Sequence, residues 1–178
     1  INETNMKNGI LVKDNLVNLS ANIGEKIIIR RANFFDKKKG MNFFYVHSSI
    51  DECIGKIISA VNIDGITKGK NEEIGVKIAM HIAASNPLAI DKDGIEKTLV
   101  DKELEIIKAE IINSGKPAEI AEKISKGKIA KFLNDNSLLN QPWIMDPKKK
   151  VSDILKESSL EKKLQVLKFT RYKVGEGI

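Results

Sequence analysis

Few side chains in this sequence could carry catalytic chemistry. The only histidines are His47 and His81, and the only cysteine is Cys53. Cys53 lies at the edge of an expected strand, without the electropositive setting that activates a thiol. The phosphate-loop pattern GxxxxGK[ST], the dinucleotide pattern GxGxxG and the nucleophile pattern GxSxG are absent. We therefore predict no catalytic residue, no metal ligand and no cofactor.

The two histidines have different sequence surroundings. His81 lies in an alanine-rich helical pattern, which favours a packed or hydrogen-bonded structural role. His47 follows Tyr45 by two residues, so both side chains point to one face of an expected strand. At the end of a hairpin, this pair could contact a partner or could be ordinary residues of a sheet edge. Both interpretations stay open.

A proline-bounded segment carries the clearest interaction signal. Trp143, Ile144 and Met145 lie between Pro142 and Pro147, which stiffen a loop that presents large apolar side chains. The loop could fold back onto the core or contact a partner. We assign Trp143 to the core, and Ile144 or Met145 to a partner.

Extended segments rich in β-branched and aromatic residues must position these candidates. Such segments predict an antiparallel three-strand meander and a closing strand that rejoins it. Their ranges are residues 26–35, 42–48, 54–63 and 164–174.

Helical patterns separate the strands. A helix ends near Gly24, and another begins at the cap Asn71 and ends before Pro87. Two narrow apolar seams, from Asp93 to Asn113 and from Pro117 onward, predict an antiparallel hairpin closed by the turn Ser114-Gly-Lys-Pro117. The seam residues are Ile95, Leu99, Leu104, Ile107 and Ile111, then Ile120, Ile124, Ile129 and Leu133.

These elements predict an α+β fold with an inserted helical hairpin. We expect the end of a preceding helix or linker in residues 1–22, a core in residues 23–92 and 138–178, and the hairpin in residues 93–137. A short helix begins at Ser152 and Asp153. The first residue, Ile1, suggests that the sequence is interrupted there.

Lysine dominates the charge of the chain. Its 30 Lys and Arg residues against 24 Asp and Glu give a net charge of +6, yet the only arginines are Arg30, Arg31 and Arg171. Base and phosphate recognition favours arginine, so we expect no specific nucleic-acid binding. A single cysteine points to a reducing compartment. The apolar stretches fall far short of the roughly 20 residues of a membrane helix, so we expect no membrane partner.

Taken together, several segments resemble elongation factor Ts, the bacterial and organellar guanine-nucleotide exchange factor for elongation factor Tu. They occur in family order: Ile23-Gly-Glu-Lys-Ile27, Ile29-Arg-Arg31, Tyr45-Val-His47, Ile78-Ala-Met-His-Ile-Ala-Ala-Ser-Asn-Pro87, Ser114-Gly-Lys-Pro117, Glu122-Lys-Ile-Ser-Lys-Gly127, Gln141-Pro-Trp-Ile-Met145 and Arg171-Tyr-Lys-Val-Gly-Glu-Gly-Ile178. No single segment is decisive, but an ordered set at family spacing is highly specific.

The resemblance implies a non-enzymatic exchange factor that binds elongation factor Tu in its GDP-bound and nucleotide-free forms. It implies that His47, with Tyr45, lies on the surface that meets the third domain of the partner. Ile144 and Met145 match residues that press on a helix of the partner's nucleotide-binding domain. The resemblance also implies a possible homodimer through the helical hairpin. The expected location is a bacterial cytoplasm, or the matrix or stroma of an endosymbiont-derived organelle.

Parts of the family pattern have no match in this sequence. The N-terminal helical module and the Thr-Asp-Phe motif, whose ring loosens GDP in the family, are missing, and so is the family's C-terminal helix. We therefore expect a fragment, which is either part of a longer exchange factor or a piece that retains docking surfaces and loses the wedge. The alternative hypothesis is a basic RNA-binding or ribosome-associated module, whose affinity would fall steeply with salt.

Overall fold

The computed structural model describes residues 1–113 and 118–177, in two units, Ile1–Phe34 and Phe35–Ile178. The first unit contains α1 (Val12–Ile23). Gly24 ends α1 in the left-handed region at φ 79°, and its N–H donates to the Ser20 carbonyl at 2.9 Å. The predicted helix and its stop are thus confirmed.

The strand predicted over residues 26–35 is wrong. These residues form no strand, and most of their side chains are exposed, including Ile28 and Phe34 at 59% and 79%. Strand propensity describes how well a side chain fits a half-buried pleated surface. A segment with high propensity still forms no strand unless a neighbouring strand hydrogen-bonds to it. The segment instead crosses the boundary between the two units.

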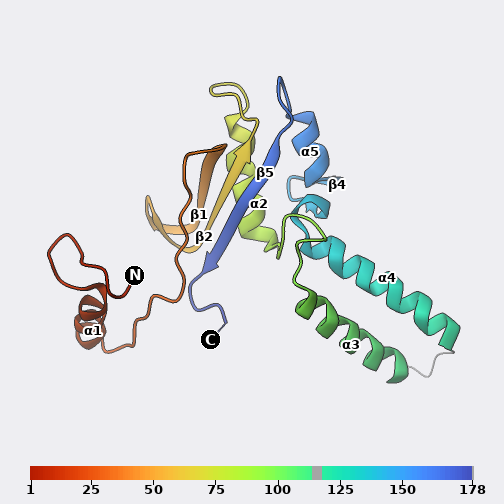
Figure 1. Ribbon diagram of the computed structural model, residues 1–178, viewed down its shortest axis with the longest axis horizontal. Coiled ribbons are helices and arrows are strands. Elements are labelled where there is room, and N and C mark those ends of the chain that lie inside the picture. Colours follow the sequence, from red (N-terminus) through yellow and green to blue (C-terminus); the bar gives the residue numbers. More distant parts are fainter. Residues whose placement is uncertain (114–117, 178) are drawn as a thin grey trace. The chain divides into compact units, whose positions relative to one another are not determined.

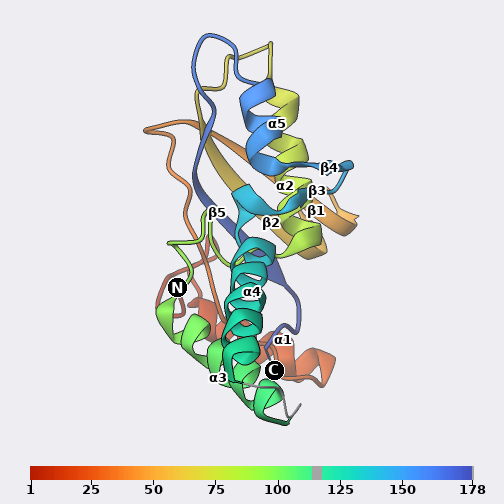
Figure 2. The same cartoon turned by 90° about the vertical axis from the view of Figure 1, so that its right-hand side faces the viewer.

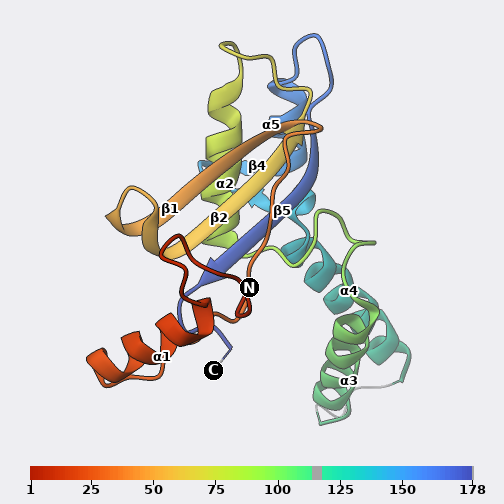
Figure 3. The same cartoon turned by 60° about the vertical axis from the view of Figure 1, so that its left-hand side comes forward.

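The second unit contains the sheet, which is antiparallel throughout. Its strands are β1 (Met41–Asp51), β2 (Ile54–Asp64) and β5 (Gln165–Lys173), in the order β1-β2-β5 (Figure 3). The strands predicted over residues 42–48, 54–63 and 164–174 are therefore confirmed. The sheet has one strand fewer than expected. Across the sheet, Tyr45 lies opposite Ser59, and Ser59 lies opposite Arg171. Residues in one such row point to the same face.

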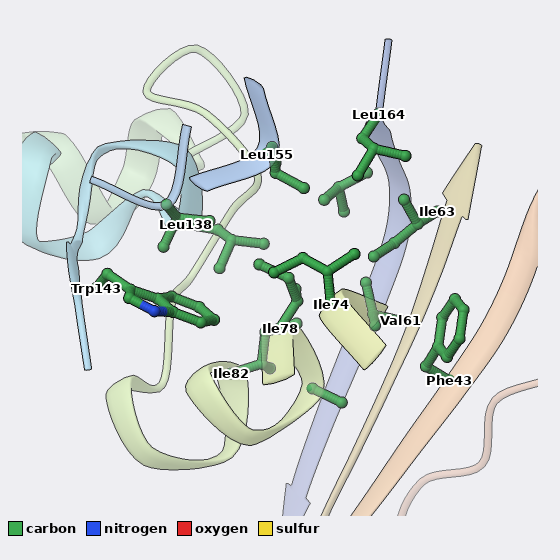
Figure 4. Close-up of a cluster of buried hydrophobic side chains, with 13 residues drawn as sticks. Phe43, Val61, Ile63, Ile74, Ile78, Ile82, Leu138, Trp143, Leu155 and Leu164 are labelled. Carbon is green, nitrogen blue, oxygen red and sulfur yellow. The ribbon is translucent and has the colours of Figure 1, made fainter. Parts of the chain in front are cut away.

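Helix α2 (Glu72–Ser85) packs on one face of the sheet and forms the core with it. Its isoleucines at spacing four, Ile74, Ile78 and Ile82, form a buried stripe. Figure 4 shows the cluster around α2, with Trp143 at one end and Phe43 at the other. The buried cluster comprises Phe43, Val61, Ile63, Ile74, Ile78, Ala79, Ile82, Leu138, Trp143, Val151, Leu155, Leu164 and Val166.

Asn71 precedes α2 as predicted, but its side chain makes no cap bond to the helix. Its Oδ1 accepts the Thr67 N–H at 2.8 Å, and its Nδ2 donates to the Ser158 carbonyl at 2.9 Å. At the other end, Asn86 stops the helix in the left-handed region at φ 46°. Asn71 therefore connects two loops at the start of α2.

Helices α3 (Lys97–Asn113) and α4 (Ala118–Asn136) pack against each other as an antiparallel pair (Figure 2). Ile107 and Ile111 are buried on the predicted seam. Leu99 is 37% exposed, so the tightly packed part of the seam lies further along α3. The helix begins later than Asp93, because residues 91–94 form a turn in which the Asp91 carboxylate accepts the Gly94 N–H at 2.9 Å. The predicted turn at residues 114–117 lies outside the described residues.

Short elements connect α4 to β5. They are the 3₁₀ helix η1 (Leu138–Asn140), β3 (Pro142–Trp143), β4 (Asp146–Lys150) and α5 (Val151–Glu157). β3 and β4 pair with each other as a small hairpin. The predicted helix at Ser152 and Asp153 is confirmed, and the Asp153 carboxylate accepts the Lys150 N–H at its start, at 3.1 Å.

Candidate partner-binding surface

The first candidate pair lies on β1, where the strand emerges from the core. Phe43, Tyr45 and His47 alternate onto one face, and they pass from buried through half-buried to exposed. A hydrogen bond joins Tyr45 Oη and His47 Nδ1 at 3.2 Å, and the ring centroids lie 6.1 Å apart. The structure thus brings this predicted pair into direct contact and leaves the imidazole accessible.

The second candidate pair forms the tip of the β3–β4 hairpin. Trp143 lies opposite Asp146, so Ile144 and Met145 are the two residues of the turn. They are 40% and 49% exposed, whereas Trp143 is 4% exposed within the core. This is the division predicted for the segment between the two prolines: the indole is buried, and the two aliphatic side chains face outward.

A buried polar network lies at the base of the β3–β4 hairpin. His81 of α2 is fully buried, its Nε2 lies 2.9 Å from Gln141 Oε1, and its ring stacks on Trp143 with centroids 5.2 Å apart. The Gln141 Nε2 donates to the carbonyls of Ser85 at 3.2 Å and Asp135 at 2.8 Å. Gln141 thus joins the C-terminal ends of α2 and α4, where helix carbonyls lack helical partners.

This network determines the protonation of His81. Because both Gln141 amide donors are used by carbonyls, Oε1 faces the imidazole and can only accept, so His81 Nε2 carries the hydrogen. Nδ1 is then an acceptor, and no donor among the described residues reaches it. Burial lowers the pKa of His81, and the hydrogen bond with Gln141 opposes this to a lesser degree. The structure therefore favours neutral His81.

Helix α2 lies between the two candidate pairs. It packs on β1 on one side, and its His81 contacts the hairpin residues on the other. Figure 1 shows α2 between the β1–β2 hairpin and the segment that includes β4. The two pairs are thus separate surfaces on either side of α2, and they do not form one cluster.

Several exposed apolar residues near the first pair were not predicted from the sequence. Phe44 is 55% exposed on the other face of β1 and meets Phe35 edge to face at 6.3 Å, while Lys168 Nζ lies 4.9 Å from the centroid of Phe35. Ile50 and Ile54 flank the β1–β2 turn and are 81% and 59% exposed. The consecutive residues Phe43 and Phe44 could have indicated an exposed ring, because neighbouring strand residues face opposite sides of the sheet.

Other kinds of site have little support in the described part of the chain. Among residues 1–113 and 118–177, no three His, Cys, Asp or Glu side chains come together as metal ligands. None of the helices described there is long and apolar enough to cross a membrane. Cys53 is exposed in the turn after β1. A pocket of about 550 Å³ lies apart from both pairs, with Leu155, Lys156 and Val166 in its lining.

An α+β domain whose candidate residues are exposed apolar and aromatic side chains presents a surface of the kind found on proteins that bind other proteins. The family model described as "Elongation factor TS" matches residues 1–176. The chain therefore belongs to the elongation factor Ts family.

Curated relatives named elongation factor Ts agree with this assignment. The protein of Caulobacter vibrioides is 34% identical over 181 residues, which cover 100% of this chain and 58% of the relative. Those of Zymomonas mobilis and Methylobacterium nodulans are 35% and 38% identical, and each alignment covers 94% of this chain and 55% of the relative. The chain thus spans little more than half the length of these curated relatives.

Proposed function

We propose that this chain binds elongation factor Tu and takes part in guanine-nucleotide exchange on it, promoting the release of GDP without covalent catalysis. The family match over residues 1–176 carries the proposal. It does not support the alternative of a basic RNA-binding module. The proposed location is a bacterial cytoplasm or an organelle descended from a bacterium.

Exchange of this kind needs only a difference in binding free energy. A factor that binds nucleotide-free elongation factor Tu more tightly than the GDP form must, by thermodynamic linkage, weaken GDP by the same factor. Such a factor needs no nucleotide-binding loop of its own, and this sequence carries no such pattern. The proposed contacts are therefore side chains that press on the partner.

Two surfaces are proposed as the contacts. Tyr45 and His47 are expected to meet the third domain of elongation factor Tu, and Ile144 and Met145 a helix of its nucleotide-binding domain. Support comes from the exposure of Ile144 and Met145, at 40% and 49%, on a short turn anchored by buried Trp143. Apolar anchors on a rigid support lose little conformational entropy on binding.

We also propose that the chain divides into a core and an inserted helical hairpin of residues 93–137. This helical hairpin would serve as a further contact with the partner or as a homodimer surface. Ile106 and Ile112 of α3 are 54% and 77% exposed, although the seam beside them is buried. Sedimentation analysis of the chain tests self-association. A dimer that Ile112→Glu converts to a monomer would support the homodimer surface, and a monomer at every concentration would reject the homodimer.

The function is tested by the release rate of fluorescent GDP from elongation factor Tu, with and without excess chain, beside a binding titration of the same pair. Faster release would mean that these surfaces disturb the nucleotide site without the Thr-Asp-Phe motif. Binding without faster release would mean that this part of the family sequence docks only. Absence of binding would reject the proposed function.

The surface is tested by Ile144→Asp. A carboxylate in an apolar contact must be desolvated, so we expect affinity for elongation factor Tu to fall about tenfold or more. Leu160→Asp is the matched control, because Leu160 is 55% exposed in the segment between α5 and β5. The control should stay within about twofold of wild type. Equal affinity of a folded Ile144→Asp variant and the wild type would reject this surface.

A further inference from the structure

We propose that His81 is a positioning residue for the partner-binding hairpin: through Gln141 and Trp143 it holds the β3–β4 turn so that Ile144 and Met145 face outward. The proposal deepens the function proposed above and rests on it. His81 itself is fully buried, so it would act on a partner only through other residues.

The first step is the fixed orientation of Gln141. Its side-chain amide makes three hydrogen bonds, with Ser85, Asp135 and His81, at 3.2, 2.8 and 2.9 Å. Its backbone carbonyl accepts the Val151 N–H at 3.1 Å, where β4 leads into α5. Gln141 is therefore held by α2, α4 and the base of the hairpin at the same time. Two of these three hydrogen bonds go to backbone carbonyls, so only the bond with His81 can be removed by substituting the partner.

The second step is the short distance along the chain from Gln141 to the tip. Pro142 has a restricted φ, Trp143 stacks on the His81 ring at an interplanar angle of 19°, and the turn residues follow at once. Any shift of the indole is thus transmitted to Ile144 and Met145 with little chain between to absorb it. One imidazole restrains both the residue before Pro142 and the residue after it.

The third step is chemical. Packing alone would be served by an apolar side chain, since the ring that stacks on His81 is an indole. A phenylalanine would keep a flat ring but leave Gln141 Oε1 without its donor in a buried position, which is costly. A glutamine would keep an N–H donor at a similar reach and lose the ring. The two substitutions therefore separate the hydrogen bond from the stacking.

The test uses the whole chain and its single tryptophan, Trp143. Three properties are measured for wild type, His81→Phe and His81→Gln: the thermal midpoint, acrylamide quenching of Trp143 in the free chain, and the dissociation constant for elongation factor Tu. We expect His81→Phe to fold, to quench at least about twofold more readily, and to bind about tenfold more weakly. His81→Gln keeps the donor to Gln141 but loses the stacked ring, so we expect its quenching and its affinity to fall between those of wild type and His81→Phe.

Ser59→Ala is the control for a loss of stability alone. The Ser59 hydroxyl donates to the Ala79 carbonyl at 2.6 Å, so the variant loses a buried hydrogen bond to α2 on the sheet side. It should lower the thermal midpoint and leave both quenching and affinity unchanged. Loss of affinity in Ser59→Ala equal to that in His81→Phe would overturn the proposal, because general destabilisation would then explain both.

The remaining outcomes are also decisive. Unchanged quenching and affinity in His81→Phe would overturn the positioning role. If that variant does not fold, Gln141→Met cuts the same link from the hairpin and is judged by the same measurements. If wild type does not bind elongation factor Tu, the proposed function fails, and quenching of Trp143 alone then decides whether His81 holds the β3–β4 turn.

Discussion

The chemistry of His81 follows from its burial. Its Nε2 donates to Gln141 and its ring lies on Trp143, both neutral side chains. A proton on Nδ1 would add a buried charge with no acceptor among the described residues. The imidazole therefore works here as a neutral donor and a flat packing surface.

Acid should destabilise the fold partly through this residue. Burial lowers the pKa of His81 below the usual value of 6.5, so the unfolded chain binds a proton at a higher pH than the folded chain does. The contribution of His81 to the free energy of unfolding is then fully present above that value and decreases as the pH falls through and below it. Thermal midpoints near pH 7.5 and 5.5 should fall more for wild type than for His81→Gln. Equal falls would contradict the assignment.

At the residue scale, the sequence predicted local environments better than long-range contacts. The burial of Trp143 and the exposure of Ile144 and Met145 follow from a short apolar segment stiffened by prolines. The bond between His81 and Gln141 joins residues 60 positions apart, and no local pattern predicts such a pair. The contact roles of Tyr45, His47, Ile144 and Met145 stay predictions.

At the scale of elements, two glycines in helices should respond in opposite ways to alanine. A Cβ on Gly75 of α2 would lie 2.3 Å from Phe43 Cδ2, whereas a Cβ on Gly127 of α4 would meet nothing within 4 Å. Gly75→Ala should lower the free energy of unfolding by about 1–3 kcal/mol through overpacking. Gly127→Ala should raise helix stability by up to about 1 kcal/mol. Urea unfolding measures both, and a stabilising Gly75→Ala would show that the Phe43 ring moves aside freely.

Helices α1 and α2 were both predicted correctly, and each has two signals in the sequence. Helix α1 has both an apolar pattern and a glycine stop, and α2 has both a spacing-four stripe and a stop before Pro87. Residues 26–35 had only composition, which is why a strand was expected where none forms. Strand formation depends on a neighbour that is distant in sequence, whereas helix hydrogen bonds close within four residues.

At the scale of the whole molecule, the helical hairpin of α3 and α4 should be removable without unfolding the sheet. The chain leaves and re-enters the core at adjacent points, because Leu88 N–H donates to the Asn136 carbonyl and Leu138 N–H to the Ala89 carbonyl, both at 2.9 Å. Replacing residues 97–131 with a flexible linker of about six residues should therefore keep a cooperative thermal transition and a shielded Trp143. A broad transition or an exposed tryptophan would show that the helices are part of the core.

The sequence by itself determined the family, the α+β class and most helices and strands. These depend on ordered motifs and local periodicity, as in Tyr45-Val-His47 and in the isoleucine stripe of α2. Only the tertiary structure decided that residues 26–35 stay outside the sheet and that α2 supports both candidate surfaces through Phe43 and His81. The physical reason is range: periodicity acts over a few residues, whereas strand pairing and buried hydrogen bonds need groups that only the folded chain brings together.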